Sequence, residues 1–297
     1  MSPQTQLHIV QATPQHVPQI QDLIHHATQL SYTSSHENTK KNKNIAELIH
    51  QKEMYLVYEE EILCGCFAFN AQGYAAALVY FYCLPDENEG DQERAQLKWN
   101  RLLEAVKKQA QVLSFNYLTV IAAPARQVWF EKQGAKPSSV LENAADAVEY
   151  YLTVIEQPWV DLPTAGLVCV KDKQLLLAFS KNKQAWYLPG GKIDAGEDSQ
   201  QALRREIEEE LSLVLQPERL SYLTHIVAPA YGEKKNILMQ QDCYYYELEE
   251  DTITVANEIG GIQYFTKEEY IRNQIPVPGV LKVFEFFAGG EGEAMRG

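Results

Sequence analysis

The stretch Leu188–Leu213, LPGGKIDAGEDSQQALRREIEEELSL, predicts the fold of the C-terminal half of the chain. The paired glycines Gly190 and Gly191 permit positive φ and a close backbone approach, so LPGGK is typical of a strand end followed by a turn. Asp198 or Ser199 is a suitable N-cap for a helix. The following segment QQALRREIEEEL contains no helix breaker and is rich in strong helix formers, which predicts one helix.

The predicted helix has one apolar face and one acidic face. Its apolar residues recur at every fourth position and form a stripe that we expect to be buried: Leu203, Ile207 and Leu211. Glu206, Glu209 and Glu210 stand at positions i, i+3 and i+4, so their carboxylates share another face. These carboxylates repel one another unless a cation lies between them, and Mg²⁺ prefers oxygen ligands of this kind. A solvated acidic face without a metal is the alternative interpretation.

The spacing of charged residues around this helix favours the metal site. Gly191 is followed after five residues by Glu197, and after seven more by Arg205 and Glu206. This arrangement resembles the Nudix box of pyrophosphohydrolases, G-(five)-E-(seven)-R-E-U-x-E-E-x-G-U, in which U is a bulky aliphatic residue. Every specified position matches except the late glycine, which is Ser212 here. We expect Ser212 in the left-handed region that ends helices, at a cost of about 1 kcal/mol.

The Nudix resemblance implies a fold and a set of metal ligands. The fold is an α/β/α sandwich with a mixed sheet over about residues 160–288. Glu206, Glu209 and Glu210 match the family's metal-binding glutamates, and the carbonyl of Gly190 matches a backbone ligand. The implied cofactor is Mg²⁺, with Mn²⁺ as the alternative.

The same resemblance implies catalytic and supporting roles. The residues that keep the metal-binding face aligned are Gly191, Glu197 and Arg205, and Glu197 pairs with Arg205. A water molecule must be deprotonated by a carboxylate or by the metal itself. Glu206, Glu209 and Glu258 are three alternatives for this base. Glu258 is considered because relatives often place an acidic residue in the corresponding loop, and a solvated loop glutamate is the other interpretation.

The implied reaction is hydrolysis of a phosphoanhydride in a nucleoside diphosphate linked to a second moiety, so the expected partner is a small nucleotide derivative. Pro229 and Tyr231 lie near positions that differ between Nudix subfamilies, but they do not choose a substrate. A nucleotide sensor without catalysis is an alternative, which the intact Glu206, Glu209 and Glu210 oppose. The resemblance also makes a homodimer one expected assembly.

The N-terminal half predicts a second α/β domain. Strands are expected at 7–10, 54–58, 62–69, 74–84, 115–122 and 147–154, helices at 13–30, 93–111 and 124–136, and a mobile loop at 31–44. This order, together with the phrase VWFEKQGA at 128–135, is similar to GNAT acetyltransferases over roughly residues 5–155. The overall fold class is therefore α/β, with an N-terminal GNAT-like domain and a C-terminal Nudix-like sandwich.

The N-terminal half departs from the GNAT pattern at one functional point. GNAT enzymes cradle the acetyl-CoA pyrophosphate with a glycine-rich loop that opens a helix. The corresponding segment Arg94–Trp99, RAQLKW, contains no glycine, and the acidic DENEGDQE precedes it. We therefore expect a degenerate domain, at residues 1–155, that serves packing, substrate positioning or dimer formation. An acetyl-CoA-dependent N-acetyltransferase, alone or within a bifunctional enzyme, is the alternative.

The remaining segments complete the predicted domain organisation. Residues 156–163, EQPWVDLP, are expected to link the halves, residues 164–288 to form the Nudix domain, and residues 289–297 to form a flexible tail. A hairpin is predicted around 171–173, strands at 220–230, 236–248 and 262–265, and helices at 266–273 and 278–287.

Composition limits the classes of partner and location. The 297 residues are enough for two domains, and the formal net charge of −14 argues against broad nucleic-acid binding. No apolar run approaches the roughly 20 residues of a membrane span. The N-terminal residues lack the pattern of a secretory signal. Five scattered cysteines suit a reducing compartment, so we expect a cytoplasmic protein that binds neither membranes nor nucleic acids.

Overall fold

A computed structural model describes residues 6–29, 44–84, 92–138 and 146–288. The chain divides into two compact units, residues 1–158 and residues 159–297, and each is described by itself. Most of the expected mobile loop at 31–44 and all of the expected tail at 289–297 lie outside the described residues.

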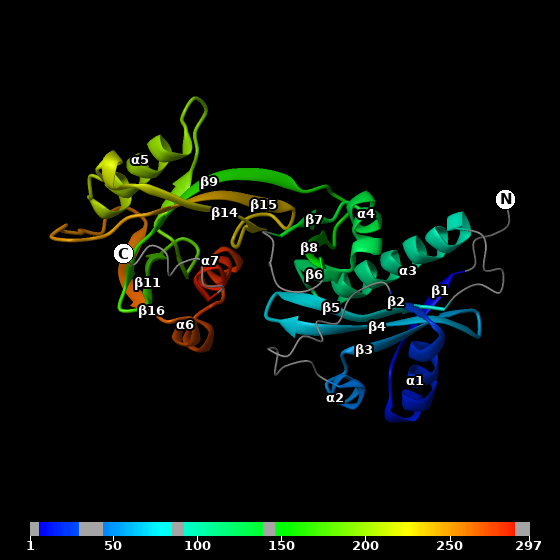
Figure 1. The fold of residues 1–297 in the computed structure, drawn as a ribbon. Helices are drawn as coiled ribbons and strands as arrows, with labels where there is room; N and C mark the ends of the chain where they lie inside the picture. The colour runs from blue at the N-terminus through cyan, green and yellow to red at the C-terminus, as the bar shows by residue number, and fades with distance from the viewer. Residues whose placement is uncertain (1–5, 30–43, 85–91, 139–145, 289–297) are drawn as a thin grey trace. The chain divides into compact units, whose positions relative to one another are not determined.

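The N-terminal unit is built on one mixed sheet of eight strands in the order β1-β3-β4-β5-β6-β8-β7, with β2 paired to β5 (Figure 1). Its strands are β1 (Leu7–Gln11), β2 (Thr28–Gln29), β3 (Met54–Glu59), β4 (Ile62–Gln72), β5 (Ala75–Cys83), β6 (Tyr117–Ala122), β7 (Lys136–Pro137) and β8 (Val148–Thr153). Its helices are α1 (Val17–His26), preceded by the 3-10 turn Pro14–His16, then α2 (Ile45–His50), α3 (Gln92–Val112) and α4 (Pro124–Lys132).

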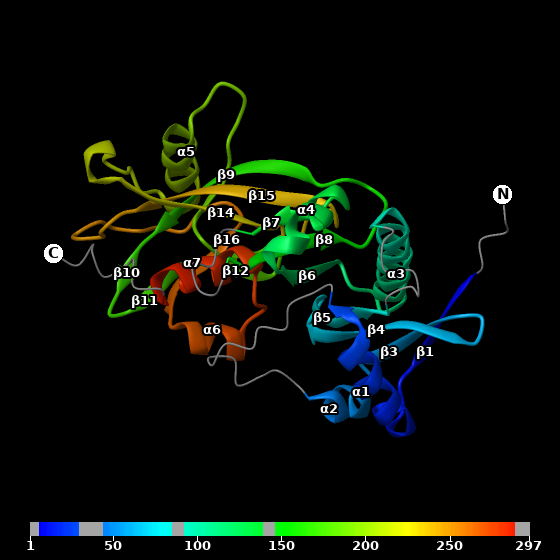
Figure 2. The ribbon, with the colours of Figure 1, turned by 45° about the vertical axis from the view of Figure 1, so that its right-hand side comes forward.

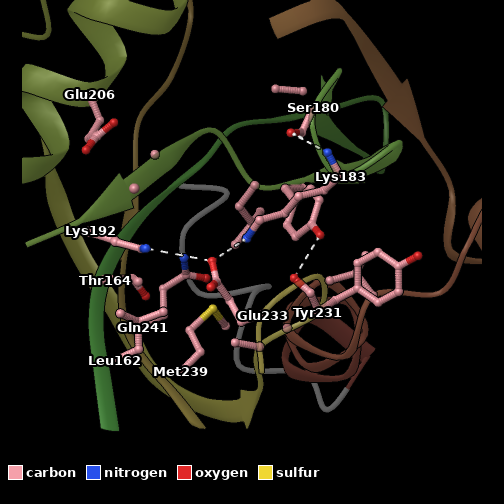
Figure 3. Close-up of a pocket in the computed structure, with 18 of the residues that line it drawn as sticks. Leu162, Thr164, Ser180, Lys183, Lys192, Glu206, Tyr231, Glu233, Met239 and Gln241 are labelled. Carbon is pink, nitrogen blue, oxygen red and sulfur yellow. Dashed lines mark hydrogen bonds and ion pairs between the residues drawn. The ribbon is translucent and has the colours of Figure 1, made fainter. Parts of the chain in front are cut away.

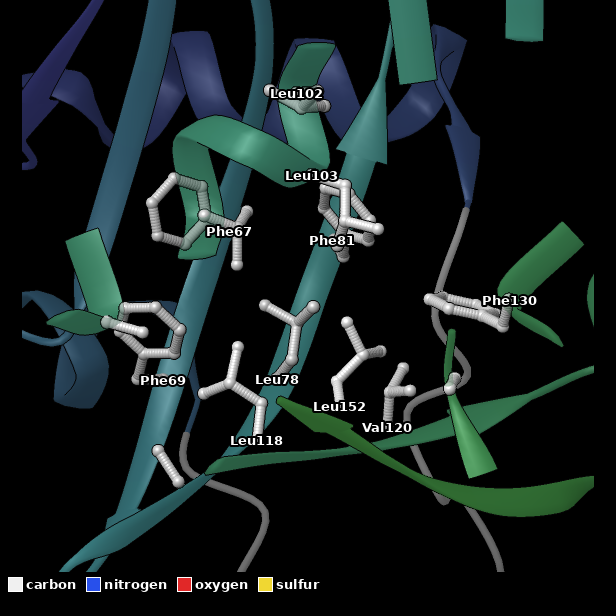
Figure 4. Packing of buried hydrophobic residues seen from close by; sticks show 14 of the residues in the cluster. Phe67, Phe69, Leu78, Phe81, Leu102, Leu103, Leu118, Val120, Phe130 and Leu152 are labelled. Atoms are coloured by element: carbon white, nitrogen blue, oxygen red, sulfur yellow. The ribbon is translucent and has the colours of Figure 1, made fainter. Parts of the chain in front are cut away.

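Helices cover both faces of this sheet, because the strands are apolar on both sides. On one face α1 and α2 place Ile20 and Leu48 against strand residues such as Leu56. On the other face α3 and α4 cover a larger cluster, which Figure 4 shows around Phe67, Phe69, Leu78, Phe81, Leu102, Leu103, Leu118, Val120, Phe130 and Leu152. The unit is therefore a three-layer α/β domain, as the sequence predicts.

The predicted order of this half is present with three additions, α2, β2 and β7. These elements are only six, two and two residues long, so none provides a clear periodic pattern. Asn44 caps α2 by accepting a hydrogen bond from the Glu47 N–H at 2.9 Å. The segment Arg94–Trp99 lies inside α3, where Trp99 packs edge to face against Trp129.

The C-terminal unit contains two four-stranded sheets. One has the order β13-β9-β15-β14, in which β9 and β15 are parallel and the other pairs antiparallel. In the other, β10, β12 and β16 all pair with β11. The strands are β9 (Val160–Val168), β10 (Val170–Lys171), β11 (Gln174–Ser180), β12 (Ala185–Tyr187), β13 (Gly190–Lys192), β14 (Ser221–Pro229), β15 (Ile237–Tyr245) and β16 (Ile259–Phe265).

Helices again lie on both sides of the strands, as Figures 1 and 2 show. The helices are α5 (Ser199–Leu211), α6 (Lys267–Asn273) and α7 (Pro278–Ala288), with a 3-10 turn at Pro217–Arg219. The expected stripe of α5, with Leu203 and Ile207, is fully buried against a cluster that includes Leu167. Tyr270 of α6 and Val283 of α7 pack into a second cluster. The expected α/β/α sandwich with a mixed sheet is thus confirmed.

The expected linker 156–163 is too long at its C-terminal end. Residues 160–163 already form the start of β9, where Val160 and Leu162 are in register with Ile237 and Met239 of β15. Two prolines and two acidic residues in this segment favoured a connection over a strand. The parallel pairing with β15 outweighs that local preference.

The structure also describes the cysteines and the length and hydropathy of the helices. All five cysteines are buried free thiols, as expected for small apolar side chains in strand-like runs. Within the described ranges, no helix is both long and apolar enough to cross a membrane.

The end of α5 provides a stability prediction. Ser212 has φ 49° and ψ 34°, the left-handed conformation expected at this position. Replacing it with glycine, Ser212→Gly, relieves the penalty on a side chain there, so the free energy of unfolding should rise by about 1 kcal/mol. Urea denaturation measures this change, and an unchanged or lower unfolding midpoint would show that Ser212 is not strained.

Candidate active site on helix α5

The start of α5 is fixed by local interactions that its sequence encodes. Asp198 accepts a hydrogen bond from the Gln201 N–H at 2.8 Å, and the Gln201 side chain accepts one from the Asp198 N–H at 3.0 Å. This capping box sets the first turn of the helix. With the apolar stripe buried, Glu206 and Glu210 face the β13 strand.

Two glycines allow β13 to approach both β9 and α5 very closely. Gly190 has φ +127°, and a Cβ atom there would lie 2.3 Å from the carbonyl oxygen of Ala165. A Cβ atom on Gly191 would lie 2.4 Å from the carboxyl carbon of Glu206. The predicted supporting role of Gly191 therefore has a geometric basis, because the Glu206 carboxylate occupies the space that any other side chain would need.

Arg205 connects the loop before α5 to the helix. Its Nε and Nη2 atoms donate to the two carboxylate oxygens of Glu197 at 2.8 and 2.9 Å. Nη1 donates to Glu206 at 2.8 Å, and Nη2 also donates to the carbonyl of Lys192 at 3.1 Å. The hydrogen bonds from Arg205 hold the pKa of Glu197 below its ordinary value. This bidentate pair therefore ties the loop, β13 and Glu206 into one arrangement.

Glu210 is a buried carboxylate that forms no ion pair with any of the basic side chains in the described part of the chain. Its side chain accepts a hydrogen bond from the Gly190 N–H at 3.1 Å, and the residue is only 7% exposed. Burial raises its pKa to about 7, the Gly190 bond opposes this shift, and the negative charges of Glu206, Glu258 and Glu209 add to it. Burial also raises the pKa of Glu206. The oxygen-rich, uncompensated charge at this point fits a hard divalent cation.

A loop that follows β15 caps the C-terminal end of α5. The Thr254 N–H donates to the Leu211 carbonyl at 2.9 Å, and the Ala256 N–H donates to the Glu210 carbonyl at 2.8 Å. The Asn257 side chain donates to the Glu209 carbonyl at 2.8 Å. These bonds satisfy carbonyl groups that a helix end leaves without partners. They also place Glu258 close enough to Glu206 and Glu210 for its negative charge to raise the pKa of both.

A cavity of about 410 Å³ lies beside these residues (Figure 3). The predicted site residues that line it are Gly190, Gly191, Glu206, Glu210 and Glu258. Glu209 does not line it, and its side chain is 53% exposed. Glu197 and Arg205 do not line it, but Arg205 donates hydrogen bonds to both Glu197 and Glu206. Across the ranges that the structure describes, no three acidic, histidine or cysteine side chains are already gathered as a metal-binding cluster.

The other cavity residues could not be assigned from the sequence. They include the basic Lys183 and Lys192, the aromatic Tyr187 and Tyr231, and the polar Glu233 and Gln241. Lys183 and Glu233 lie in turns between strands, and only the pairing of those strands brings the turns together. Pro229 and Tyr231, which had no assigned role, also line the cavity.

Comparison with known proteins gives a family match for part of the chain. Residues 161–282 match the family model of the NUDIX domain. This match agrees with the motif found in the sequence between Gly191 and Leu213. No curated protein matches the chain.

Several solved structures are similar to parts of the chain. A MutT NUDIX hydrolase from Burkholderia pseudomallei has 22% identity and a TM-score of 0.35, with 42% of this chain and 96% of that chain covered. An Ap4A hydrolase from C. elegans has 20% identity and a TM-score of 0.34, with 45% and 98% covered. N-acetylglutamate synthase from Neisseria gonorrhoeae has 16% identity and a TM-score of 0.37, with 51% and 34% covered.

The space around Gly191 generates a prediction about activity. A Gly191→Ala side chain must displace the Glu206 carboxylate, which is the flexible end of a side chain and can move at little cost to folding. Hydrolytic activity should therefore fall by roughly tenfold or more, because small displacements in an active site are costly. The unfolding midpoint should change little.

Gly261→Ala is the matched control. A Cβ atom at Gly261 meets nothing within 4 Å, so this variant should keep both activity and stability. Equal activities for the two variants would contradict the role assigned to Gly191.

Proposed function

We propose that the C-terminal unit catalyses Mg²⁺-dependent hydrolysis of a phosphoanhydride bond in a nucleoside diphosphate linked to another moiety. The observation that carries this proposal is the composition of a single cavity. Its wall contains the carboxylates of Glu206, Glu210 and Glu258 and also the ammonium groups of Lys183 and Lys192. Such a combination suits a polyanionic substrate that binds with a metal ion at one end and with basic side chains at the other.

Glu206, Glu209 and Glu210 are the proposed ligands of the Mg²⁺ ion, together with the carbonyl of Gly190, and Mn²⁺ is the alternative ion. Support comes from the buried, uncompensated Glu210 and from the placement of Glu206 by Arg205. When bound, a divalent cation would neutralise phosphate oxygens and lower the pKa of a bound water. Glu209 is on the same helical face but is half exposed, so its side chain must turn toward the cavity to take part.

The proposed chemistry requires a base for the attacking water. The water oxygen forms a new bond to phosphorus, the bridging P–O bond breaks, and the water proton passes to a carboxylate. Glu206, Glu209 and Glu258 are the proposed alternatives for this base. Glu206 and Glu258 line the cavity, which supports these two over the half-exposed Glu209. Arg205 and Glu197 act by positioning Glu206.

The size and lining of the cavity support a small-molecule substrate. About 410 Å³ lies in the usual range for pockets that hold ligands of nucleotide size. Tyr187 and Tyr231 provide aromatic surface beside the lysines. These features suit a nucleotide derivative but do not select its second moiety.

For the N-terminal unit we propose a role in packing or substrate positioning. The segment Arg94–Trp99 is helical, so the N–H groups of Gln96–Trp99 are used inside α3 and do not face a pyrophosphate. The two units in this proposal are residues 1–158 and residues 159–297. The homodimer and the cytoplasmic location stay predictions.

Product release from a substrate panel tests the proposed reaction. The panel contains ADP-ribose, NADH, dinucleoside polyphosphates, nucleoside triphosphates, sugar nucleotides and CoA, each with and without Mg²⁺. Glu206→Gln and Glu209→Gln should each lower the rate by roughly 100-fold or more, because each removes a charge from the proposed metal site.

Glu208→Gln is the matched control, since Glu208 lies on the same helix, is exposed and does not line the cavity. It should retain near wild-type rates. Cleavage that is independent of Mg²⁺, or equal losses in Glu206→Gln and Glu208→Gln, would contradict the proposed function.

A further inference from the structure

Three charged side chains meet on the cavity wall beside the carboxylates of α5. The Nζ atom of Lys183 lies 3.2 Å from Oε1 of Glu233, and the Nζ atom of Lys192 lies 3.7 Å from the same oxygen. Figure 3 shows the two lysines reaching Glu233 from two sides. We call Lys183 and Lys192 the lysine pair. One carboxylate oxygen of Glu233 thus forms ion pairs with both ammonium groups.

The surrounding structure holds Lys183 in this position. Its ammonium lies 5.3 Å from the centre of the Tyr187 ring, and the Tyr187 hydroxyl donates to the Tyr231 carbonyl at 3.2 Å. Gly232 has φ +77°, and a Cβ atom there would lie 3.0 Å from Cδ of Lys183. The loop between β14 and β15 therefore leaves room for the lysine stem. Because Lys183 is 33% exposed, its ammonium is only partly solvated.

Lys192 is fixed through its backbone rather than through its side chain. It ends β13, where it pairs with Thr164, and its carbonyl accepts a hydrogen bond from Arg205. Its side chain is 59% exposed and reaches along the cavity wall to Glu233. The same arginine that positions Glu206 thus also positions the backbone from which Lys192 extends.

Glu233 is a partly buried carboxylate that the lysine pair keeps ionised. It is 28% exposed, and burial alone would raise its pKa. The hydrogen bond and charge of Lys183, with a contribution from Lys192, outweigh burial and hold the pKa below its ordinary value. Glu233 is therefore ionised at neutral pH and competes with any anion that approaches the lysine pair.

We propose that the lysine pair is the subsite for the substrate phosphate group farther from the α5 carboxylates, and that Glu233 is a built-in competitor which this phosphate displaces. This inference rests on the proposed function, since it concerns the same cavity and the same class of substrate. A phosphate presents several anionic oxygens to the two ammonium groups, whereas Glu233 reaches both with a single oxygen. A ligand with a neutral group at this position cannot displace Glu233 and binds more weakly.

Equilibrium binding without turnover tests the subsite. The probe is α,β-methylene-ADP, whose bridge resists hydrolysis, and adenosine is the uncharged comparison, both titrated by calorimetry in Mg²⁺. Glu233→Gln removes the competing charge, so the probe should bind roughly threefold to tenfold more tightly, as expected for a partly exposed ion pair. Lys183→Met should weaken binding of the probe by a similar factor. Adenosine binding should change in neither variant.

A double variant and two controls make this test specific. In Lys183→Met/Glu233→Gln the gain from Glu233→Gln should largely disappear, because the competition acts through the lysine. Lys234→Met and Glu250→Gln alter exposed charges outside the cavity and should leave binding of the probe unchanged. A Glu233→Gln protein that binds the probe no more tightly, or a gain that persists in full in the double variant, would overturn the inference.

Failure of the phosphate subsite can be distinguished from failure of the proposed hydrolysis. If the probe binds and the variants respond as described while the wild type hydrolyses no member of the panel, the phosphate subsite stands and the proposed reaction falls. If the wild type hydrolyses its substrate but Glu233→Gln and Lys183→Met leave probe affinity unchanged, the reaction stands and the subsite falls.

Discussion

The close approach of the β13 backbone to its neighbours is the constraint on which the site depends. The Gly190 backbone lies against the Ala165 carbonyl of β9, and the Gly191 backbone lies against the Glu206 carboxylate of α5. A side chain at Gly190 would collide with the β9 backbone, and one at Gly191 would displace the Glu206 carboxylate. With the strand in place, the Gly190 N–H reaches Glu210 and the carbonyl of Lys192 reaches Arg205. The position of the β13 backbone therefore determines where the carboxylates of Glu206 and Glu210 lie.

The same packing creates an electrostatic cost at Glu210. Burying an ionised carboxylate without a cationic partner is unfavourable, and the neighbouring glutamates add to the cost for Glu210. Arg205 does not relieve it, because its hydrogen bonds go to Glu197, Glu206 and the Lys192 carbonyl. A divalent cation bound between the carboxylates would supply the compensating charge. The buried charge thus lowers the stability of the folded protein, and binding of a cation would restore that stability.

Local sequence patterns predicted the features that depend only on residues within or next to helix α5. The N-cap at Asp198, the buried stripe of α5 and the left-handed Ser212 all follow from residues within one helix. The Glu197–Arg205 contact, which the Nudix resemblance implied, is also present. The start of β9 at Val160 was missed because it depends on pairing with the distant β15.

Contacts between distant loops could not be predicted from the sequence either, because they too depend on segments that are far apart in the chain. Glu258 comes near Glu206 only because its loop caps the end of α5, and a capping partner from another part of the chain leaves no periodic pattern. The lysine pair and Glu233 come from two turns and a strand end that the sheet brings together. Residue type and spacing thus identified Glu206 and Glu210, whereas Glu258 was named only through the Nudix resemblance and the basic half of the cavity required the fold.

Titration of the protein with Mn²⁺, followed by electron paramagnetic resonance of the free ion, tests the central claim most directly. The wild type and Glu208→Gln should bind Mn²⁺ equally well, whereas Glu206→Gln and Glu210→Gln should each lose roughly tenfold or more in affinity because each loses a charged ligand. Equal Mn²⁺ affinity in all four proteins would show that the carboxylates of α5 do not form a metal site and would contradict the account.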